Sequence, residues 1–280
     1  MHLLTFDIEE WYNFDNITRD YHWENSPSRI DEGMERILAE LEKRELKATC
    51  FCMGWIAEKH PHIIRAIHAQ GHHIGCHSYK HELATRFDRK GFRNDTEKAQ
   101  KMIEDLIGEN VDAFRAPGFS ITEKNTWALD ILADLGFRYD CSLFPAAHDY
   151  GGYKSYGKAE PALLHLANGY QLKEFPINIH RLLGKNIVFS GGGFFRLFPY
   201  PLIHRWAKQS PYMMTYFHPQ DFDPDIPMIK TLPLMRKFKS YVGLKQSFSK
   251  FKRLLDDFSF INLREADMQI DWEKVRIINI

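Results

Sequence analysis

The sequence predicts an α/β fold built on a parallel sheet or barrel. Short apolar runs typical of strands alternate with segments in which apolar residues recur at the spacing of an amphipathic helix. Strands and helices that alternate in this way form βαβ units, and these units assemble parallel sheets. The chain of 280 residues contains no repeat, low-complexity tract or obvious linker, so we expect a single domain over residues 1–280.

The first half of the chain alternates regularly between the two kinds of element. An apolar N-terminal run forms the first strand and leads directly into TFDIEEW, residues 5–11. A helix follows, with Ser26 as its expected N-cap and Pro27 as its first helical residue. The next predicted elements are a strand at 48–53, a helix over 63–71 ending at Gly71, a strand at 72–78, a helix over 94–108, a short strand at 112–117, a helix capped by Thr122 and ended by Gly136, and a strand at 137–144.

The second half is irregular between about residues 145 and 200. The pattern then resumes with a helix over 201–210, a strand at 212–218, a helix from about 244 to 257 and a strand at 258–263. Aromatic residues are dense between Phe194 and Phe217, beside the three glycines at 191–193. We expect most of these rings to fill the core; the alternative is that a few form a platform for a sugar ring or a lipid carrier.

Composition excludes several classes of protein. Lys+Arg and Asp+Glu are balanced at 37 each, so no overall charge attracts nucleic acid or an anionic membrane. The N-terminus shows no targeting signal and no apolar run is long enough to span a membrane, so a cytoplasmic location is expected. The four cysteines are expected to be reduced and buried, with a zinc site on Cys50 and Cys52 as a minor alternative.

Carboxylates and histidines follow two of the predicted strands. Asp7 and Glu9 come at the end of the first strand and share a face, whereas Glu10 points elsewhere. His77 and His81 follow the strand at 72–78, and a helical turn there would bring both imidazoles to one metal ion. Two histidines and one carboxylate would leave an open position on zinc, with the second carboxylate free as a base. The alternative is a solvated loop in which Asp7 only caps a turn.

Five short segments stand out in order along the chain: TFDIEE at 5–10, HSYKH at 77–81, RAPGF at 115–119, YDCSLFP at 139–145 and TYFHP at 215–219. In this order they resemble the motifs of the polysaccharide deacetylases, carbohydrate esterase family four, also called the nodulation-protein-B homology domain. Later segments, such as SGGGFFRLFPY and YFHPQDFDPD, resemble the branch of the family found in exopolysaccharide and surface-glycan gene clusters.

This resemblance implies a fold, a reaction and a cofactor. The fold would be a distorted, seven-stranded (β/α) barrel over about residues 1–225, followed by a C-terminal helix and strand over about 226–280. The reaction would be hydrolysis of the N-acetyl group of an amino sugar in a polysaccharide or glycan precursor, with release of acetate. The cofactor would be a divalent metal, with Zn²⁺ expected and Co²⁺, Ni²⁺ or Mn²⁺ as alternatives.

The resemblance also implies roles for individual residues. Asp7 would be the general base and His218 the general acid. Arg115 would pair with Asp7, and Asp140 would hold Arg115 in turn. The implied metal ligands are Glu9, His77 and His81.

Two departures from the family pattern affect these assignments. The aspartate that usually follows the base is replaced by Ile8, so Glu9 is taken as the carboxylate ligand and Glu10 is kept as the alternative. The tryptophan that lines the acetyl pocket in many members is missing from the fourth motif. The residues expected at the substrate are therefore Pro117, Leu143 and Trp11, with a backbone N–H near Leu143 facing the oxyanion.

Two rival functions remain open on the same fold. One is a carbohydrate-binding protein without catalysis; the other is a metal-independent amidohydrolase acting on a small cyclic amide. The expected partner is an N-acetylated glycan or glycan precursor, with peripheral membrane contact if that substrate is lipid-linked.

Overall fold

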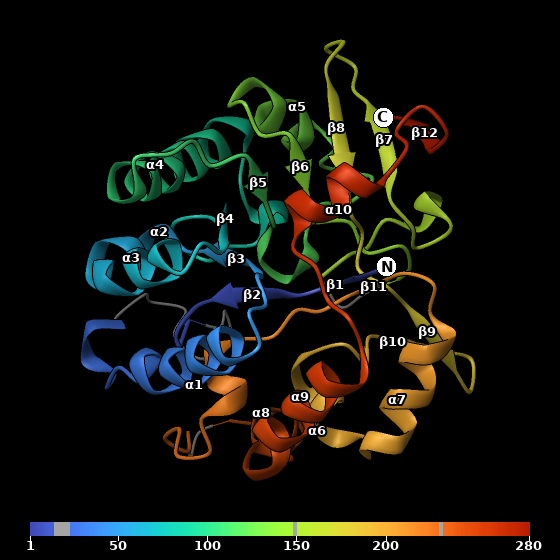
Figure 1. Ribbon diagram of the computed structural model, residues 1–280. Helices are drawn as coiled ribbons and strands as arrows, with labels where there is room; N and C mark the ends of the chain where they lie inside the picture. The colour runs from blue at the N-terminus through green and yellow to red at the C-terminus, as the bar shows by residue number, and fades with distance from the viewer. Residues whose placement is uncertain (14–22, 148–149, 230–231) are drawn as a thin grey trace.

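The computed structural model describes residues 1–13, 23–147, 150–229 and 232–280, and it has an α/β fold (Figure 1). Its eight-stranded sheet has the order β12-β7-β8-β6-β5-β4-β3-β2, in which β7 and β8 are the one antiparallel pair, so that β12 and β7 run opposite to the other six strands. A further parallel pair, β1 with β11, lies at the start of β2. The predicted class, α/β with a mostly parallel sheet that curves into a distorted barrel, is confirmed. The strands are β1 His2–Leu3, β2 Thr5–Ile8, β3 Thr49–Cys52, β4 His73–Cys76, β5 Ala113–Phe114, β6 Tyr139–Asp140, β7 Ala162–His165, β8 Gln171–Glu174, β9 His180–Leu182, β10 Lys185–Ile187, β11 Met213–Met214 and β12 Arg276–Asn279.

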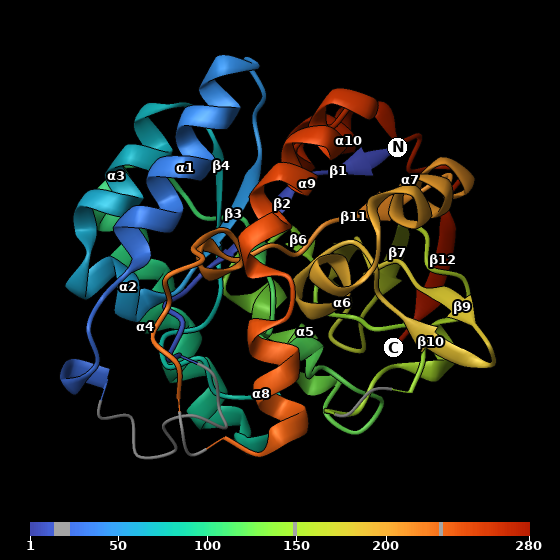
Figure 2. The same cartoon turned by 90° about the horizontal axis from the view of Figure 1, so that it is seen from below.

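The helices lie around the sheet, and Figure 2 shows the C-terminal helices on the side opposite α3 and α4. Gly136 ends α5 with a positive φ of 87°, as predicted, and α9 has the predicted bounds. The helices are α1 Ile30–Lys43, α2 Gly54–Lys59, α3 Pro61–Ala69, α4 Arg89–Ile107, α5 Trp127–Asp134, α6 Gly192–Leu197, α7 Tyr200–Gln209, α8 Leu234–Tyr241, α9 Leu244–Asp257 and α10 Leu263–Gln269.

Three predicted helix starts are wrong, because side chains satisfy the backbone in other ways. The helix predicted from residue 94 begins at Arg89, where the Asp88 carboxylate accepts the Gly91 N–H. The first helix begins at Ile30, not Pro27, since the Glu10 carboxylate accepts the N–H groups of Arg29 and Ile30. The fifth begins at Trp127. Thr122 instead forms a turn in which its N–H and hydroxyl both donate to Asn125 Oδ1.

The predicted last strand at 258–263 is also wrong. Only Ile261 forms a bridge, with Leu3, and α10 begins two residues later. Asn262 and Glu265 exchange side-chain to backbone hydrogen bonds at 2.9 Å, a capping box that ends the extended segment. The stretch at 145–200 contains β7 to β10, which the sequence pattern did not reveal. The chain then returns to the sheet through β12, which pairs with β7.

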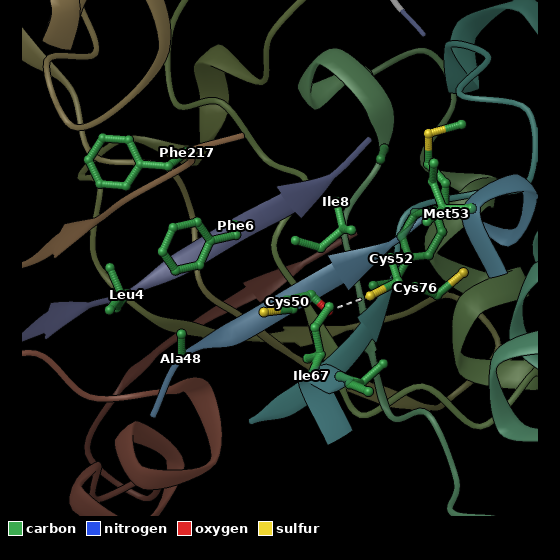
Figure 3. Packing of buried hydrophobic residues seen from close by; sticks show 14 of the residues in the cluster. Leu4, Phe6, Ile8, Ala48, Cys50, Cys52, Met53, Ile67, Cys76 and Phe217 are labelled. Carbon is green, nitrogen blue, oxygen red and sulfur yellow. Dashed lines mark hydrogen bonds between the residues drawn. The ribbon is translucent and has the colours of Figure 1, made fainter. Parts of the chain in front are cut away.

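The first strands alternate their side chains between the helix-covered face and the barrel interior. Phe6 and Ile8 pack with Cys50 and Cys52 on the helix-covered face (Figure 3). Asp7 lies between them in the sequence, so it points to the other face. All four cysteines are free and buried, as predicted. Burial raises the pKa of the Cys50 thiol, which is the behaviour of a core residue rather than a metal ligand.

The three glycines at 191–193 allow chain segments to pack closely. A Cβ at Gly191 would lie 2.5 Å from the carbonyl oxygen of Tyr216, and one at Gly193 would lie 3.1 Å from that of Lys239. Phe195 is fully buried against Phe217 with ring centroids 4.8 Å apart. These contacts confirm the core interpretation for Phe195 and give the glycines a packing role.

Candidate active site

Asp7 and Glu9 enter the site from the C-terminal end of β2. In the sheet register Asp7 lies beside Phe51 of β3, which lies beside Gly75 of β4. A Cβ at Gly75 would lie 2.6 Å from the Phe51 ring, so glycine makes room for that ring on the interior face. Because β2, β3 and β4 are parallel, their C-terminal ends meet at one edge of the barrel.

Glu9, His77 and His81 form a buried cluster at this edge. Their ligand atoms all lie within 4.8 Å of one another, and Glu9 Oε2 is 2.6 Å from His81 Nε2. His77 Nδ1 lies 2.7 Å from the backbone carbonyl of Arg115, which can only accept, so this nitrogen carries the proton and Nε2 keeps its lone pair. Two imidazoles and a carboxylate are a donor set that suits zinc, and the hydrogen bond from His77 Nδ1 to the Arg115 carbonyl orients the ring as in a metal ligand.

The predicted helical turn between His77 and His81 is wrong. The segment is an irregular bend with positive φ at Ser78 (61°) and His81 (55°). Asp95 holds the bend, because its carboxylate accepts the Tyr79 N–H at 2.8 Å and the Lys80 N–H at 3.3 Å. The two imidazoles nevertheless converge, with ring centroids 5.1 Å apart.

Glu10 does not join this cluster. Its carboxylate accepts hydrogen bonds from the Ser28 hydroxyl and from the N–H groups of Arg29 and Ile30. It therefore caps α1, where negative charge also stabilises the helix dipole. The structure brings Glu9 to the histidines and uses Glu10 to position a helix.

The charges within the site set the protonation states of its members. Burial disfavours the Glu9 carboxylate, but the cations at His81 and His218 outweigh burial and hold its pKa at about 2. Burial lowers the pKa of His77 to about 4, so this imidazole is neutral and able to bind a metal. Burial also opposes a charge on His81, but the contact with Glu9 raises its pKa overall.

Arg115 is fully buried and orients Asp7, as predicted. Its Nη1 donates to Asp7 Oδ1 at 2.6 Å, and its Nη2 donates to Thr5 Oγ1 at 2.8 Å. Phe51 lies against the guanidinium, 4.2 Å from the ring centroid. The ion pair leaves the second oxygen of Asp7 facing His218, with Oδ2 3.9 Å from His218 Nε2.

His218 lies across the site and has a partner that sequence reasoning missed. Asp221 Oδ2 is 3.0 Å from His218 Nδ1 and also accepts the His218 N–H, while Asp221 Oδ1 is 3.0 Å from Arg196 Nε. Burial opposes the charge on His218, but Glu9 and Asp221 raise its pKa to about 9. The sequence signal for Asp221 was its spacing of three residues from His218 in HPQD, which matches a capping box.

Asp140 does not hold Arg115, contrary to the prediction. Among the described contacts, its Oδ1 accepts from the Ser142 hydroxyl at 2.5 Å, and its register partner on β8 is Glu174. Ser142 Oγ in turn accepts the N–H of Ala116, the residue after Arg115. Burial raises the pKa of both carboxyl groups; Asp140 raises that of Glu174 further, whereas the hydrogen bond with Glu174 offsets part of the rise at Asp140. The two carboxyl groups therefore share a proton above the usual carboxyl pKa.

Replacing Glu174 with Gln is expected to change the pH dependence of stability. Folded Glu174 keeps its proton above pH 4.5, where the unfolded chain loses it. The unfolding free energy therefore loses about 1.4 kcal/mol for each pH unit above the unfolded pKa until the folded pKa is reached. Urea unfolding of wild type and Glu174→Gln at several pH values checks this: the variant should gain stability relative to wild type as pH rises. Parallel curves would contradict a proton on Glu174, and Glu160→Gln, on the surface, is the matched control.

The three residues expected at the substrate are placed differently. Leu143 is fully buried and its N–H donates to Glu174 Oε1 at 3.2 Å, so this N–H is not available to an oxyanion. Trp11 is buried beside Tyr12, and its Nε1 donates to the Pro27 carbonyl in the segment that precedes α1. Pro117 is buried in the turn after Arg115. Pro117 follows Arg115 by two residues, as Trp11 follows Glu9.

Comparison with known proteins assigns the site to a family. Residues 3–139 match the polysaccharide deacetylase family model, and residues 141–267 match a domain of unknown function, DUF3473. Residues 3–139 therefore form a polysaccharide deacetylase domain, and this part of the chain carries Asp7, Glu9, His77, His81 and Arg115. His218 and Asp221 lie in the second matched region.

Curated relatives support this assignment. The chain is 33% identical over 100 residues to a peptidoglycan-N-acetylglucosamine deacetylase of Bacillus cereus, covering 35% of this chain and 36% of that protein. It is 29% identical over 130 residues to a peptidoglycan deacetylase of Helicobacter pylori, covering 44% and 43%. The chain thus spans well under half the length of these relatives.

Solved structures show the same fold. A structure from Mycobacterium smegmatis assigned to the polysaccharide deacetylases covers 100% of this chain and 92% of that one, with a TM-score of 0.67 and 17% identity. A pseudoenzyme of carbohydrate esterase family four from Bacillus anthracis covers 95% and 64%, with a TM-score of 0.51 and 15% identity. At these identities the likeness concerns the fold alone.

Proposed function

We propose that this protein is a metal-dependent N-deacetylase that hydrolyses the acetamido group of an N-acetylated amino sugar in a glycan or glycan precursor. The observation that carries the proposal is the buried cluster of Glu9, His77 and His81 beside a base–arginine pair and a protonated histidine. Names of the relatives support N-acetylglucosamine-containing glycans as the substrate class.

The donor set fits a divalent metal. Glu9, His77 and His81 would hold it, and Zn²⁺ suits two imidazoles and a carboxylate best, with Co²⁺, Ni²⁺ and Mn²⁺ as alternatives. Such an ion would polarise the acetamide carbonyl and acidify the attacking water. An amide is a poor electrophile, so this contribution is essential to the proposed reaction.

The remaining steps belong to this chain's own side chains. Asp7, held by Arg115 at 2.6 Å, accepts a proton from the water through its free oxygen Oδ2. The water oxygen bonds to the carbonyl carbon, and the C–N bond then breaks. His218 donates its proton to the departing nitrogen, which leaves as the amine while acetate is released. Asp221 supports this role because its carboxylate orients His218 through Nδ1.

The arrangement favours catalysis over mere glycan binding. A binding protein needs neither the buried Asp7–Arg115 pair nor a histidine held protonated beside it, and burying charges of this kind is costly. The cluster of Glu9, His77 and His81 argues against an enzyme without metal, because these three side chains would then have no role. We place the activity in the cytoplasm, on a glycan precursor, with the four free cysteines as support.

Acetate release tests the proposal. Purified protein loaded with Zn²⁺ should release acetate from N-acetylglucosamine oligomers or peptidoglycan fragments, detected enzymatically, and removal of metal by a chelator should abolish it. Re-addition of Zn²⁺ should restore the rate. Release that persists after thorough chelation would favour the metal-independent amidohydrolase. Binding of the oligomers without release by the metal-loaded protein would favour the carbohydrate-binding alternative.

A further inference from the structure

Helix α8 presents large apolar side chains to solvent. Leu234 is 87% exposed, Met235 68% and Phe238 52%, and Met228 in the preceding loop is 58% exposed. At about 100° per residue, the three helical side chains share one face. None of the residues of α8 whose burial is described is buried, although the helix is amphipathic in sequence. A contiguous exposed apolar face of this kind marks an interaction surface.

Positive charge flanks this face. Lys237 and Lys239 lie on either side of Phe238 around the helix, and neither forms an ion pair with the described residues. Residues 232–255 contain seven lysines and arginines and no aspartate or glutamate, although the whole chain is balanced at 37 charges of each sign. The balance of charge over the whole chain therefore conceals a segment that is locally basic.

The surface is connected to the site by one arginine. Arg196 Nη1 and Nη2 donate to the carbonyls of Ser240 and Lys239 at the C-terminal end of α8, at 2.5 and 3.0 Å. Its Nε contacts Asp221, which holds His218. Both views place α8 at the periphery of the molecule, away from β7 and β12 (Figures 1 and 2). A partner bound to α8 would thus lie on the same side of the molecule as His218.

We propose that α8 docks the protein on an anionic lipid bilayer, with Leu234, Met235 and Phe238 inserted at the headgroup level and Lys237 and Lys239 on the lipid phosphates. Amphipathic helices that lie in the membrane interface have this arrangement, in which lysines flank an apolar face. Nucleic acid would match the lysines but leave the apolar side chains exposed, so a bilayer accounts for both features. Among the described residues no helix could cross the membrane, and docking requires none.

Vesicle sedimentation tests the proposal on the intact protein. Wild type should sediment with vesicles of phosphatidylcholine and phosphatidylglycerol, and much less with phosphatidylcholine alone. Lys237→Glu/Lys239→Glu should weaken the partition about thirtyfold or more. Leu234→Gln/Met235→Gln should weaken it about tenfold or more, because apolar burial is lost. All four side chains lie outside the core, so circular dichroism should report folded variants.

The matched control reverses two charges on another exposed helix. Arg205→Glu/Lys208→Glu on α7 makes the same change in net charge and should sediment like wild type. Equal loss in this control would overturn the proposal, because overall charge would then explain the binding. Wild type that stays in the supernatant with both kinds of vesicle would also overturn it and would leave α8 as a contact for another protein. Sedimentation does not depend on acetate release, so this result is separate from the proposed activity.

Discussion

Asp7→Asn is expected to lower the rate of acetate release by about 100-fold or more while the protein keeps its metal. The asparagine can still accept a hydrogen bond from Arg115 but cannot accept the proton of the attacking water. Asp7 lies outside the cluster of Glu9, His77 and His81, so metal content should match that of wild type. Initial rates with Zn²⁺-loaded protein, together with elemental mass spectrometry, measure both quantities.

Stability must be followed in the same experiment. Removing the carboxylate leaves the buried Arg115 without its charge partner, which costs about 3 kcal/mol or more in such pairs. Thermal unfolding shows whether the variant is folded at the assay temperature. Asp112→Asn is the matched control: it also removes the carboxylate from an ionic contact, the partly buried one with His73 at 2.9 Å, but lies at the other end of the strands. A folded Asp7→Asn protein with nearly normal rates would contradict the role of Asp7 as base.

The double variant His77→Ala/His81→Ala is expected to lose its metal and, with it, measurable acetate release. Two of the three donors disappear, and Glu9 alone is a weak ligand. Wild type should contain one tightly held divalent ion per chain after purification. Elemental mass spectrometry of both proteins, before and after incubation with Zn²⁺, measures the difference.

Two controls sharpen this measurement. Glu10→Gln changes a neighbouring carboxylate that caps α1, so it should keep both metal and activity. A second, more exposed cluster of Asp31, His60 and His62 is unchanged in every variant, so any ion that it binds is common to all of them. Equal metal content in wild type and the double variant would show that Glu9, His77 and His81 do not hold the ion.

The candidate site was largely predictable because its residues follow strands. Asp7 and Glu9 share a face by the two-residue period of β2, and parallel strands bring their ends together at one edge. The pairing of Arg115 with Asp7 was predicted from the resemblance and confirmed at 2.6 Å. Asp221 was missed although its spacing from His218 is visible, since a capping box and a catalytic partner look the same in sequence.

Other details depended on contacts between distant segments. Glu10 is 20 residues from Ile30, whose N–H it accepts, and this contact moves the start of α1. Asp140 was expected to hold Arg115 but lies beside Glu174 of β8. That strand belongs to a stretch of the sequence that has no clear periodicity. The bend from His77 to His81 is set by Asp95 from α4 rather than by local helix formation.

The sequence by itself determined the α/β class, the core faces of the strands, the reduced cysteines and the set of residues that meets at the ends of β2 and β4. These features follow from local periodicity and from motifs, which are encoded within short segments. The tertiary structure alone decided which carboxylate reaches the histidines and which group orients His218. It also leaves the apolar face of α8 uncovered. Those outcomes depend on how buried polar groups find partners across the fold, and a local pattern carries no information about partners far away in the chain.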